Sequence, residues 1–169
     1  MIRRAILSFA CVCFLSMEIV AVQGSSVEGG TPCPKLVGLL VPESVFGTST
    51  SNFSRIELRQ CDPARSESIQ IVAWEKDNNS PALVIDTTDF VVVQTVARGN
   101  VYLIETTGGP RDRVYVIAYE KGKPLLKLMR VTRGTARVTI TNEWLEVVIP
   151  EIYAGDEPPR TETHRFSVR

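Results

Sequence analysis

The sequence predicts an all-β protein: an antiparallel meander of about ten short strands, forming a two-sheet sandwich or a partly closed barrel, after a cleaved signal peptide. Three observations lead to this fold class. Nearly every apolar stretch beyond the N-terminus is short and rich in Val, Ile, Tyr and Thr. Turn residues separate these stretches at spacings of ~8–13 residues, too close for the crossovers that parallel strands require. Beyond residue 24, no stretch shows three helical turns with a continuous apolar stripe.

The first 24 residues have the pattern of an export signal. Arg3 and Arg4 precede an apolar run over 5–17, and Ala21 and Gly24 supply small residues at which cleavage can occur. The run is shorter than the ~20 residues that a membrane-spanning helix needs. We therefore predict that residues 1–24 are removed, leaving a secreted or periplasmic protein without a stable membrane anchor. The alternative is an uncleaved helix that tethers the protein.

The mature chain divides into a linker and one domain. Residues 25–35 are small, polar and rich in Gly and Pro, which predicts a flexible linker, and residues 36–169 form a single β domain. Two of the four cysteines fall within the signal peptide, so Cys33 and Cys61 remain as one pair. In an exported domain such a pair predicts a disulfide, and two buried free thiols are the alternative.

The strands follow one another to the C-terminus, and the last ones show the clearest alternation. The candidates are 36–42, 54–60, 67–75, 82–87, 89–98, 100–106, 113–120, 124–132, 135–141 and 143–150. In 135–141 and 143–150 apolar and polar residues alternate, which predicts one buried and one wet face. In 100–106 and 113–120 both faces are apolar, so these two strands are expected nearer the middle. Alternation over 163–168 indicates a final edge strand, and a frayed end is the alternative.

Charge and motifs exclude several functions. The chain has 19 basic and 19 acidic side chains, and removal of residues 1–24 leaves 17 and 18, a net charge of −1. Without a basic excess, nucleic-acid binding is not expected. The sequence has no phosphate-binding glycine motif, and Gly108-Gly109-Pro110 is a turn. With one histidine and no metal-ligand spacing, neither a cofactor nor a metal is predicted.

Catalytic groups are few. His164, the only histidine, lies near the C-terminus, and no serine-nucleophile motif accompanies it, so it is interpreted as an ordinary edge-strand residue. Carboxylates are numerous, and strand pairing could bring together Glu105 with Glu120, or Glu75 with Asp86, as in a glycosidase. The spacing favours neither pair. No catalytic residue is assigned.

Aromatic residues are the strongest candidates for a binding surface. They fall mostly on the register opposite the aliphatic faces, and rings on an outer sheet face are typical of sugar or protein recognition. The candidate binding residues are Trp144, Trp74, Tyr102, Tyr115 and Tyr119. The alternative is that another layer covers this second face or that the rings form ordinary cross-strand pairs.

The sequence therefore favours a non-catalytic extracytoplasmic module, binding or structural, that recognises a protein, a glycan or an envelope component. One alternative is a carboxylate-dependent extracellular hydrolase. Another is a protease-inhibitor-like protein presenting an exposed loop such as 43–53 or 154–162. Asn52 and Asn78 match the glycosylation acceptor pattern, which matters only for a eukaryotic source.

Overall fold

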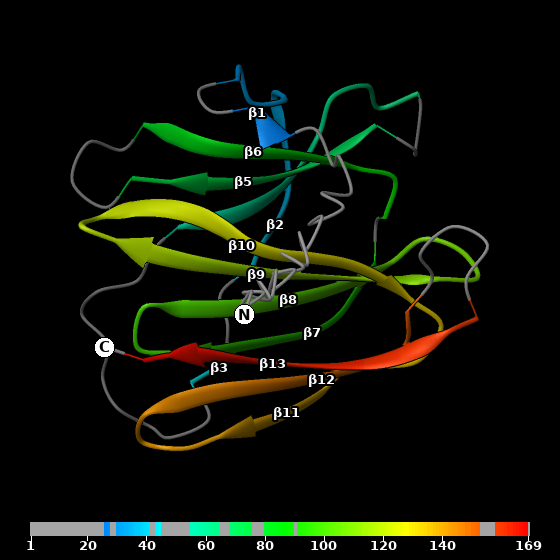
Figure 1. Cartoon of the computed structure of the whole chain (residues 1–169). Coiled ribbons are helices and arrows are strands. Elements are labelled where there is room, and N and C mark those ends of the chain that lie inside the picture. Colours follow the sequence, from blue (N-terminus) through cyan, green and yellow to red (C-terminus); the bar gives the residue numbers. More distant parts are fainter. Residues whose placement is uncertain are drawn as a thin grey trace, which may run out of the picture.

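The computed structural model describes residues 26–27, 30–40, 43–44, 55–64, 68–75, 80–89, 91–152 and 158–168. Within these ranges every regular element is a β-strand, and the strands form two sheets (Figure 1). The structure is therefore all-β with antiparallel strands in two sheets, as predicted. The predicted signal peptide at 1–24 and the two glycosylation motifs at Asn52 and Asn78 lie outside the described residues.

The smaller sheet has five strands in the order β1-β6-β5-β4-β2, and all of its pairs are antiparallel. Its strands are β1 (Ser26–Val27), β2 (Lys35–Leu39), β4 (Ile56–Gln60), β5 (Ile69–Trp74) and β6 (Pro81–Thr87). Cys33, just before β2, forms a disulfide with Cys61, just after β4, as predicted; their Cα atoms are 4.4 Å apart. The disulfide joins the ends of the edge strand β2 and its neighbour β4. Two residues of the segment 25–35 form β1.

The larger sheet has the order β11-β12-β10-β9-β8-β7-β3, with β13 paired on β12. Its strands are β3 (Glu43–Ser44), β7 (Val91–Arg98), β8 (Val101–Thr107), β9 (Asp112–Glu120), β10 (Lys123–Thr132), β11 (Arg137–Ile140), β12 (Trp144–Ile152) and β13 (Arg160–Ser167). Only the short contact of β3 with β7 is parallel among the described pairs. The chain leaves the simple meander where β3 joins this sheet and where β6 passes to β7.

A bend between β10 and β11 curls the larger sheet into a nearly closed barrel. Thr132, the last residue of β10, pairs with Ile152 of β12, and β11 continues along the same strand. The buried Thr132 hydroxyl donates to the Pro150 carbonyl and accepts the Gly134 N–H at 3.2 Å. These bonds give hydrogen-bond partners to the backbone carbonyl of Pro150 and the backbone N–H of Gly134 at the bend. As a result β11, β12 and β13 fold over one face of β8, β9 and β10, in the lower part of Figure 1.

Two apolar cores follow from this arrangement. Between the sheets, Ile71 and Ile85 pack in one cluster with Ile117. Inside the barrel, Val116 and Leu145 pack in a second cluster. Successive residues of a strand face opposite sides, so β8 and β9 contribute to both cores and are buried on both faces. The two apolar faces seen in the sequence thus correspond to the middle layer. Each fully buried aliphatic side chain contributes ~1.5–3 kcal/mol.

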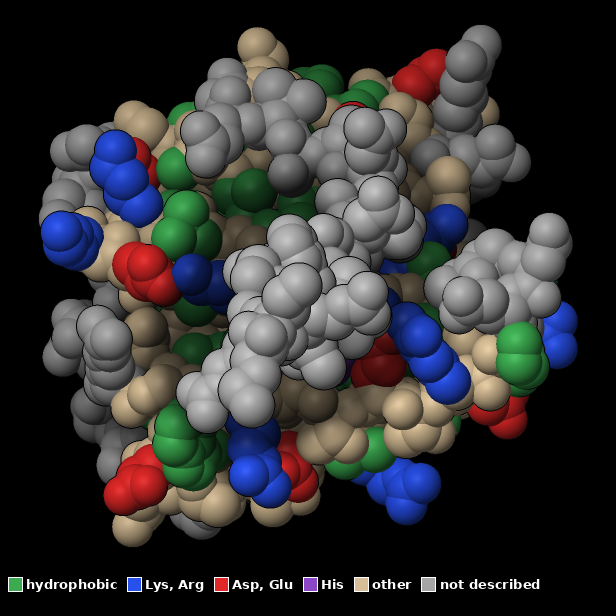
Figure 2. All heavy atoms as spheres, viewed as in Figure 1, with side chains coloured by type: hydrophobic (Ala, Val, Ile, Leu, Met, Phe, Trp, Pro, Cys, Tyr) green, Lys and Arg blue, Asp and Glu red, His purple; other side chains and the backbone are tan. Residues whose placement is uncertain are grey.

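The surface carries mixed charge. On the face shown in Figure 2, basic and acidic side chains are interspersed rather than gathered by sign. Six large apolar side chains among the described residues are exposed: Leu36, Val37, Leu39, Val91, Val93 and Trp144. Among the described residues, no helix is long and apolar enough to cross a membrane.

Candidate functional site

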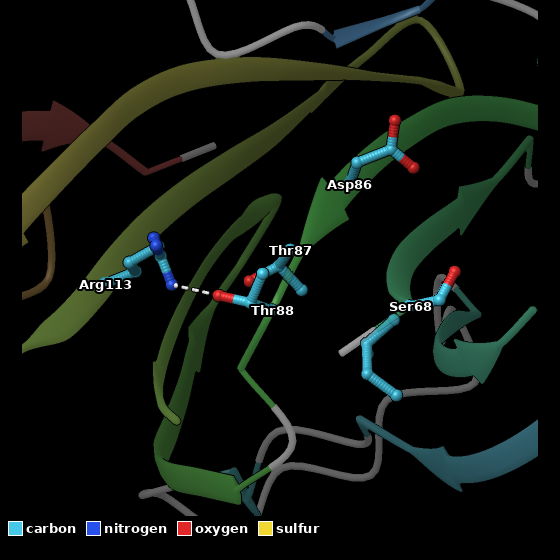
Figure 3. A pocket seen from close by; sticks show the side chains of 6 residues that line it. Ser68, Asp86, Thr87, Thr88 and Arg113 are labelled. Atoms are coloured by element: carbon cyan, nitrogen blue, oxygen red, sulfur yellow. Dashed lines mark hydrogen bonds between the residues drawn. The ribbon is translucent and has the colours of Figure 1, made fainter. Parts of the chain in front are cut away.

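A polar hollow lies where the chain passes from the smaller sheet to the larger one. We call it the threonine hollow; it measures about 290 Å³ (Figure 3). Its lining residues are Ser68, Ile69, Asp86, Thr87, Thr88 and Arg113. Most of them carry hydroxyl, carboxylate or guanidinium groups, so the hollow offers both hydrogen-bond donors and acceptors.

Strand ends place these residues together. The first residue of β5, Ile69, pairs with the last residue of β6, Thr87, and Gln70 pairs with Asp86. The Gln70 side chain donates to the Asp86 carboxylate at 2.9 Å and accepts the backbone N–H of Cys33 at 2.9 Å. The Asp86 carboxylate, which is exposed, is therefore oriented by a side chain that is itself held beside the disulfide.

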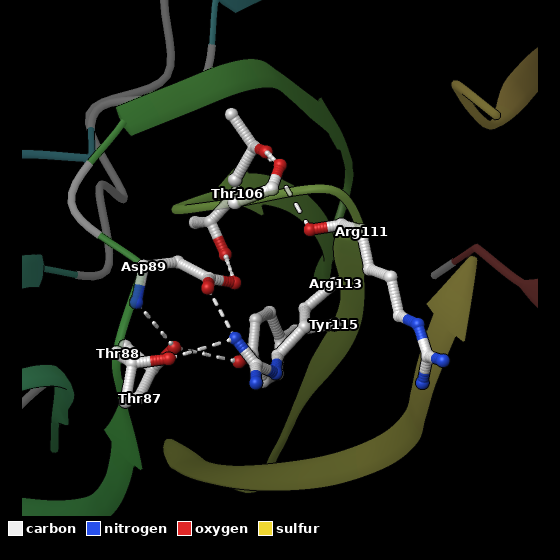
Figure 4. Close-up of polar contacts among 9 residues, drawn as sticks. Thr87, Thr88, Asp89, Thr106, Arg111, Arg113 and Tyr115 are labelled. Atoms are coloured by element: carbon white, nitrogen blue, oxygen red, sulfur yellow. Dashed lines mark hydrogen bonds and ion pairs between the residues drawn. The ribbon is translucent and has the colours of Figure 1, made fainter. Parts of the chain in front are cut away.

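A buried ion pair supports the far wall of the hollow (Figure 4). Asp89 is 1% exposed, and its carboxylate accepts a bond from the Thr106 hydroxyl at 2.9 Å and forms an ion pair with Nη1 of Arg113. Its backbone N–H donates to the Thr87 hydroxyl at 3.1 Å. A buried carboxylate is stable only when paired and hydrogen-bonded. The pairing fixes the position of Arg113 at the hollow.

Arg113 retains hydrogen-bonding capacity. Its bonds to Asp89 and to the Thr88 hydroxyl, the latter 3.2 Å long, both come from Nη1. A guanidinium group also carries N–H donors on Nη2 and Nε, and the Arg113 side chain is 33% exposed. Arg113 therefore combines a fixed position with donors that remain for a ligand.

Behind the lining residue Thr87 lies a buried phenol, that of Tyr115, which does not itself line the hollow. The Tyr115 hydroxyl donates to the Thr87 hydroxyl at 3.2 Å. Burial raises the pKa of Tyr115, because the phenolate would lose its hydration. The ring therefore stays protonated and serves as a donor.

Gly108 allows the turn after β8 to lie against this region. A Cβ at Gly108 would be 2.8 Å from both the Asp89 Cα and the Thr88 carbonyl oxygen. Backbone atoms cannot move aside easily, so this position requires glycine for space. The predicted turn at 108–110 thus has a structural role beside the hollow.

Three of the five predicted aromatic binding residues do not lie on an outer sheet face. Tyr102, Tyr115 and Tyr119 are buried in the core between the two sheets, so their expected place on an outer face is wrong. The reason is that the smaller sheet covers the face of β8 and β9 from which these rings project. Tyr102 and Tyr119 make an edge-to-face contact with ring centroids 5.5 Å apart. This is the covered-face alternative that the sequence leaves open.

The two tryptophans lie apart from one another in the fold. Trp74, at the end of β5, is half-buried; the Arg55 guanidinium lies 3.8 Å from its ring centroid, and Tyr119 donates to its carbonyl at 3.0 Å. Trp144, at the start of β12, is 42% exposed. It lies on the outward register with Glu146, as the alternation indicates, because Leu145 and Val147 face the barrel core.

The carboxylate pairs suggested by the sequence are not assembled. Glu105 pairs with Val114 of β9, and Glu120 lies roughly 20 Å farther along that strand. Asp86 pairs with Gln70 of β5, and Glu75, the residue after the end of β5, lies ~17 Å farther along the chain. Neither distance suits a pair of carboxyls acting on one glycosidic bond.

Glu105 is instead a fully buried link inside the barrel. Its carboxylate accepts bonds from the Ala136 N–H at 3.0 Å and from the Gln94 side chain, which also donates to the Ala136 carbonyl at 2.7 Å. Burial raises the pKa of Glu105, and these bonds reduce the rise only in part. The group joins β7, β8 and the bend before β11.

His164 belongs to a charged cluster on β13. Its Nε2 lies 2.9 Å from the Glu162 carboxylate. The same carboxylate accepts a hydrogen bond of 2.9 Å from Nε of Arg130 on β10. Burial alone would raise the pKa of Glu162, but the bonds from Arg130 and His164 outweigh it and lower that pKa. The histidine thus has a structural partner on its own edge strand. Among the described residues, no group of three or more His, Cys, Asp or Glu side chains could hold a metal ion.

The sequence reasoning missed Arg113, Thr87 and Thr88. One signal was present: the run Asp86-Thr87-Thr88-Asp89, four consecutive polar residues between two apolar strands. Arg113 gave no comparable signal. Its partner Asp89 is 24 residues away in the sequence and does not belong to a neighbouring strand of the meander. Comparisons of the chain with protein-family models, curated proteins and solved structures find no match.

Proposed function

We propose that the protein is a non-catalytic extracytoplasmic binding module that recognises a glycan at the threonine hollow. The observation that carries the proposal is Arg113, a partly exposed guanidinium held in place by the buried Asp89 at the wall of a hydroxyl-lined hollow. Preorganised groups bind more tightly, because less conformational entropy is lost when the ligand arrives.

The chemistry of the hollow suits a sugar. Each sugar hydroxyl both donates and accepts hydrogen bonds, and here the Asp86 carboxylate accepts, Arg113 donates, and the Thr88 hydroxyl does either. Ile69 is 3% exposed and adds only a small apolar area to the lining. A ligand that presents several adjacent hydroxyls would use all of these groups together.

An extracytoplasmic location is supported by two features. The Cys33–Cys61 disulfide is of the kind that persists in oxidising compartments. The N-terminal sequence has the order of charges, apolar residues and small residues found in export signals. No contact among the described residues favours the hydrolase or the protease inhibitor; residues 45–54 and 153–157, which make up most of the inhibitor-type loops, lie outside them.

The experiment is a screen of the oxidised protein against immobilised glycans, followed by calorimetric titration of any glycan that binds. Asp86→Asn and Arg113→Lys should each weaken binding about tenfold, because the first replaces a charged acceptor by a neutral one and the second removes the guanidinium donors on Nη2 and Nε. Arg137→Gln is the control, since this exposed residue lies on β11, away from the hollow. Absence of binding to any glycan, or equal affinity of all variants, would refute the proposal.

A further inference from the structure

A second hollow lies at the opposite end of β9, beside the seam where β10 and β13 leave the barrel open. We call it the seam hollow; it measures about 490 Å³. The hairpin turns at Gly99–Asn100 and Lys121–Gly122 form one side of it, and the end of β13 forms the other. The lining residues that bear on its ligand are Val101, Ala118, Lys121, Lys127, Arg165 and Phe166. Its volume lies in the range of small-molecule sites, about 300–1,000 Å³.

The inner wall of the seam hollow is apolar. Val101 and Ala118 are buried members of the barrel core, and Phe166 packs partly buried against the same core. Since β13 is hydrogen-bonded only to β12 among the described strands, its edge toward β10 is not closed by a strand ladder. A ligand entering here would continue the barrel core with its own apolar atoms.

The rim of the seam hollow is cationic. Lys121 is exposed in the turn between β9 and β10, Lys127 lies at the bulge of β10, and Arg165 projects from β13. Lys127 Nζ is 2.6 Å from the Glu120 carboxylate, and Arg165 Nε is 2.5 Å from that of Glu146. Among the described residues at this rim, Lys121, Lys127 and Arg165 and the two carboxylates paired with Lys127 and Arg165 sum to a net charge of +1.

We propose that the seam hollow binds an amphipathic anion, a single apolar chain ending in a carboxylate or a comparable anionic group. The chain lies against Val101, Ala118 and Phe166, and the anion lies at Lys121 and Lys127. An ammonium group has three donors, so Lys127 can bond the anion while it keeps Glu120. The apolar wall sets this ligand apart from the sugar proposed for the polar threonine hollow, and the two sites are independent.

The test uses octanoate as the probe, with 1-octanol and acetate as comparison ligands that lack the charge and the chain respectively. Titration is followed by amide chemical shifts of the isotope-labelled protein. We expect saturable shifts at Ala118 and Phe166 with octanoate, affinity for 1-octanol lower by about fivefold, and no saturation with acetate at the same concentrations.

Charge variants test the rim separately from the wall. Lys121→Asn should fold normally, because Lys121 has φ 52° and asparagine tolerates this left-handed conformation. It should lower octanoate affinity about fivefold, and so should Lys127→Gln. Lys123→Gln is the matched control: it lies in the same hairpin but points to Glu75 of the smaller sheet, 3.6 Å away. Equal affinity for octanoate and 1-octanol, full affinity in Lys121→Asn, or no saturable shift at all would overturn the proposal.

Discussion

Removal of the Asp89 carboxylate should destabilise the protein more than any single polar change at the surface. The Asp89 side chain is 2% exposed. Its carboxylate accepts a hydrogen bond from the buried Thr106 hydroxyl and forms an ion pair with the Arg113 guanidinium. In Asp89→Ala the Thr106 hydroxyl loses its acceptor, at ~1–3 kcal/mol, and a charged hydrogen bond worth ~1.5–3 kcal/mol is lost. The expected loss is about 3–5 kcal/mol, the usual effect of breaking a buried ion pair. Asp89→Asn keeps one acceptor and should lose only ~1.5–3 kcal/mol.

The assay is urea unfolding at pH 7 with the disulfide intact. Asp86→Asn serves as the control, since this exposed carboxylate three residues earlier should change the free energy of unfolding by less than ~0.5 kcal/mol. The reasoning predicts the order Asp89→Ala, then Asp89→Asn, then the control. If Asp89→Ala lies within 1 kcal/mol of the parent protein, roughly the value of one neutral hydrogen bond, then Asp89 does not hold Arg113 as described.

Three further predictions follow from burial, space and protonation. Trp144→Ala should change the free energy of unfolding by less than ~0.5 kcal/mol, because the side chain is 42% exposed; thermal unfolding that shows a loss of ~3 kcal/mol or more would place the ring in the interior. Gly108→Ala should lose about 1–3 kcal/mol, because its Cβ would meet backbone at 2.8 Å, whereas Gly109→Ala meets nothing within 4 Å and should be nearly neutral in the same denaturant assay. The raised pKa of Glu105 means that its contribution to stability is fully present below the ordinary pKa of an unfolded glutamate and is lost as pH rises through the higher folded pKa. Unfolding measured from pH 4 to pH 8 should therefore show the parent protein losing stability relative to Glu105→Gln as pH rises, and a constant difference would contradict the buried carboxylate.

The strands could be predicted because the sequence carries their signals locally. Turn residues separate short apolar stretches, and alternation distinguishes the two faces of each strand. The sequence therefore located β7 to β12 within a few residues and indicated that β8 and β9 lie in the middle. The covering layers could not be assigned, since alternation shows that a face is apolar but not which sheet covers it. For this reason the sequence predicts Tyr102 and Tyr115 on an outer face, whereas both lie in the core between the sheets.

The site was less predictable for a related reason. Asp89 and Arg113 meet only because β6 passes to the other sheet and β9 returns beside it, a long-range arrangement with no local pattern. The same holds for the bend after Thr132, which closes the barrel through one pair with Ile152. Local signals fix strands and turns, whereas contacts between layers depend on how the whole chain packs.

The most direct test of the proposed function is to map where a bound glycan contacts the protein. With a glycan from the screen, amide chemical shifts should change at Thr88 and Arg113 beside the threonine hollow, and the indole signal of Trp144 should stay in place. The same titration of Arg113→Lys should show weaker binding with the same pattern. Shifts that centre on Trp144 and leave Thr88 and Arg113 unchanged would contradict the account and assign recognition to the outer face of β12.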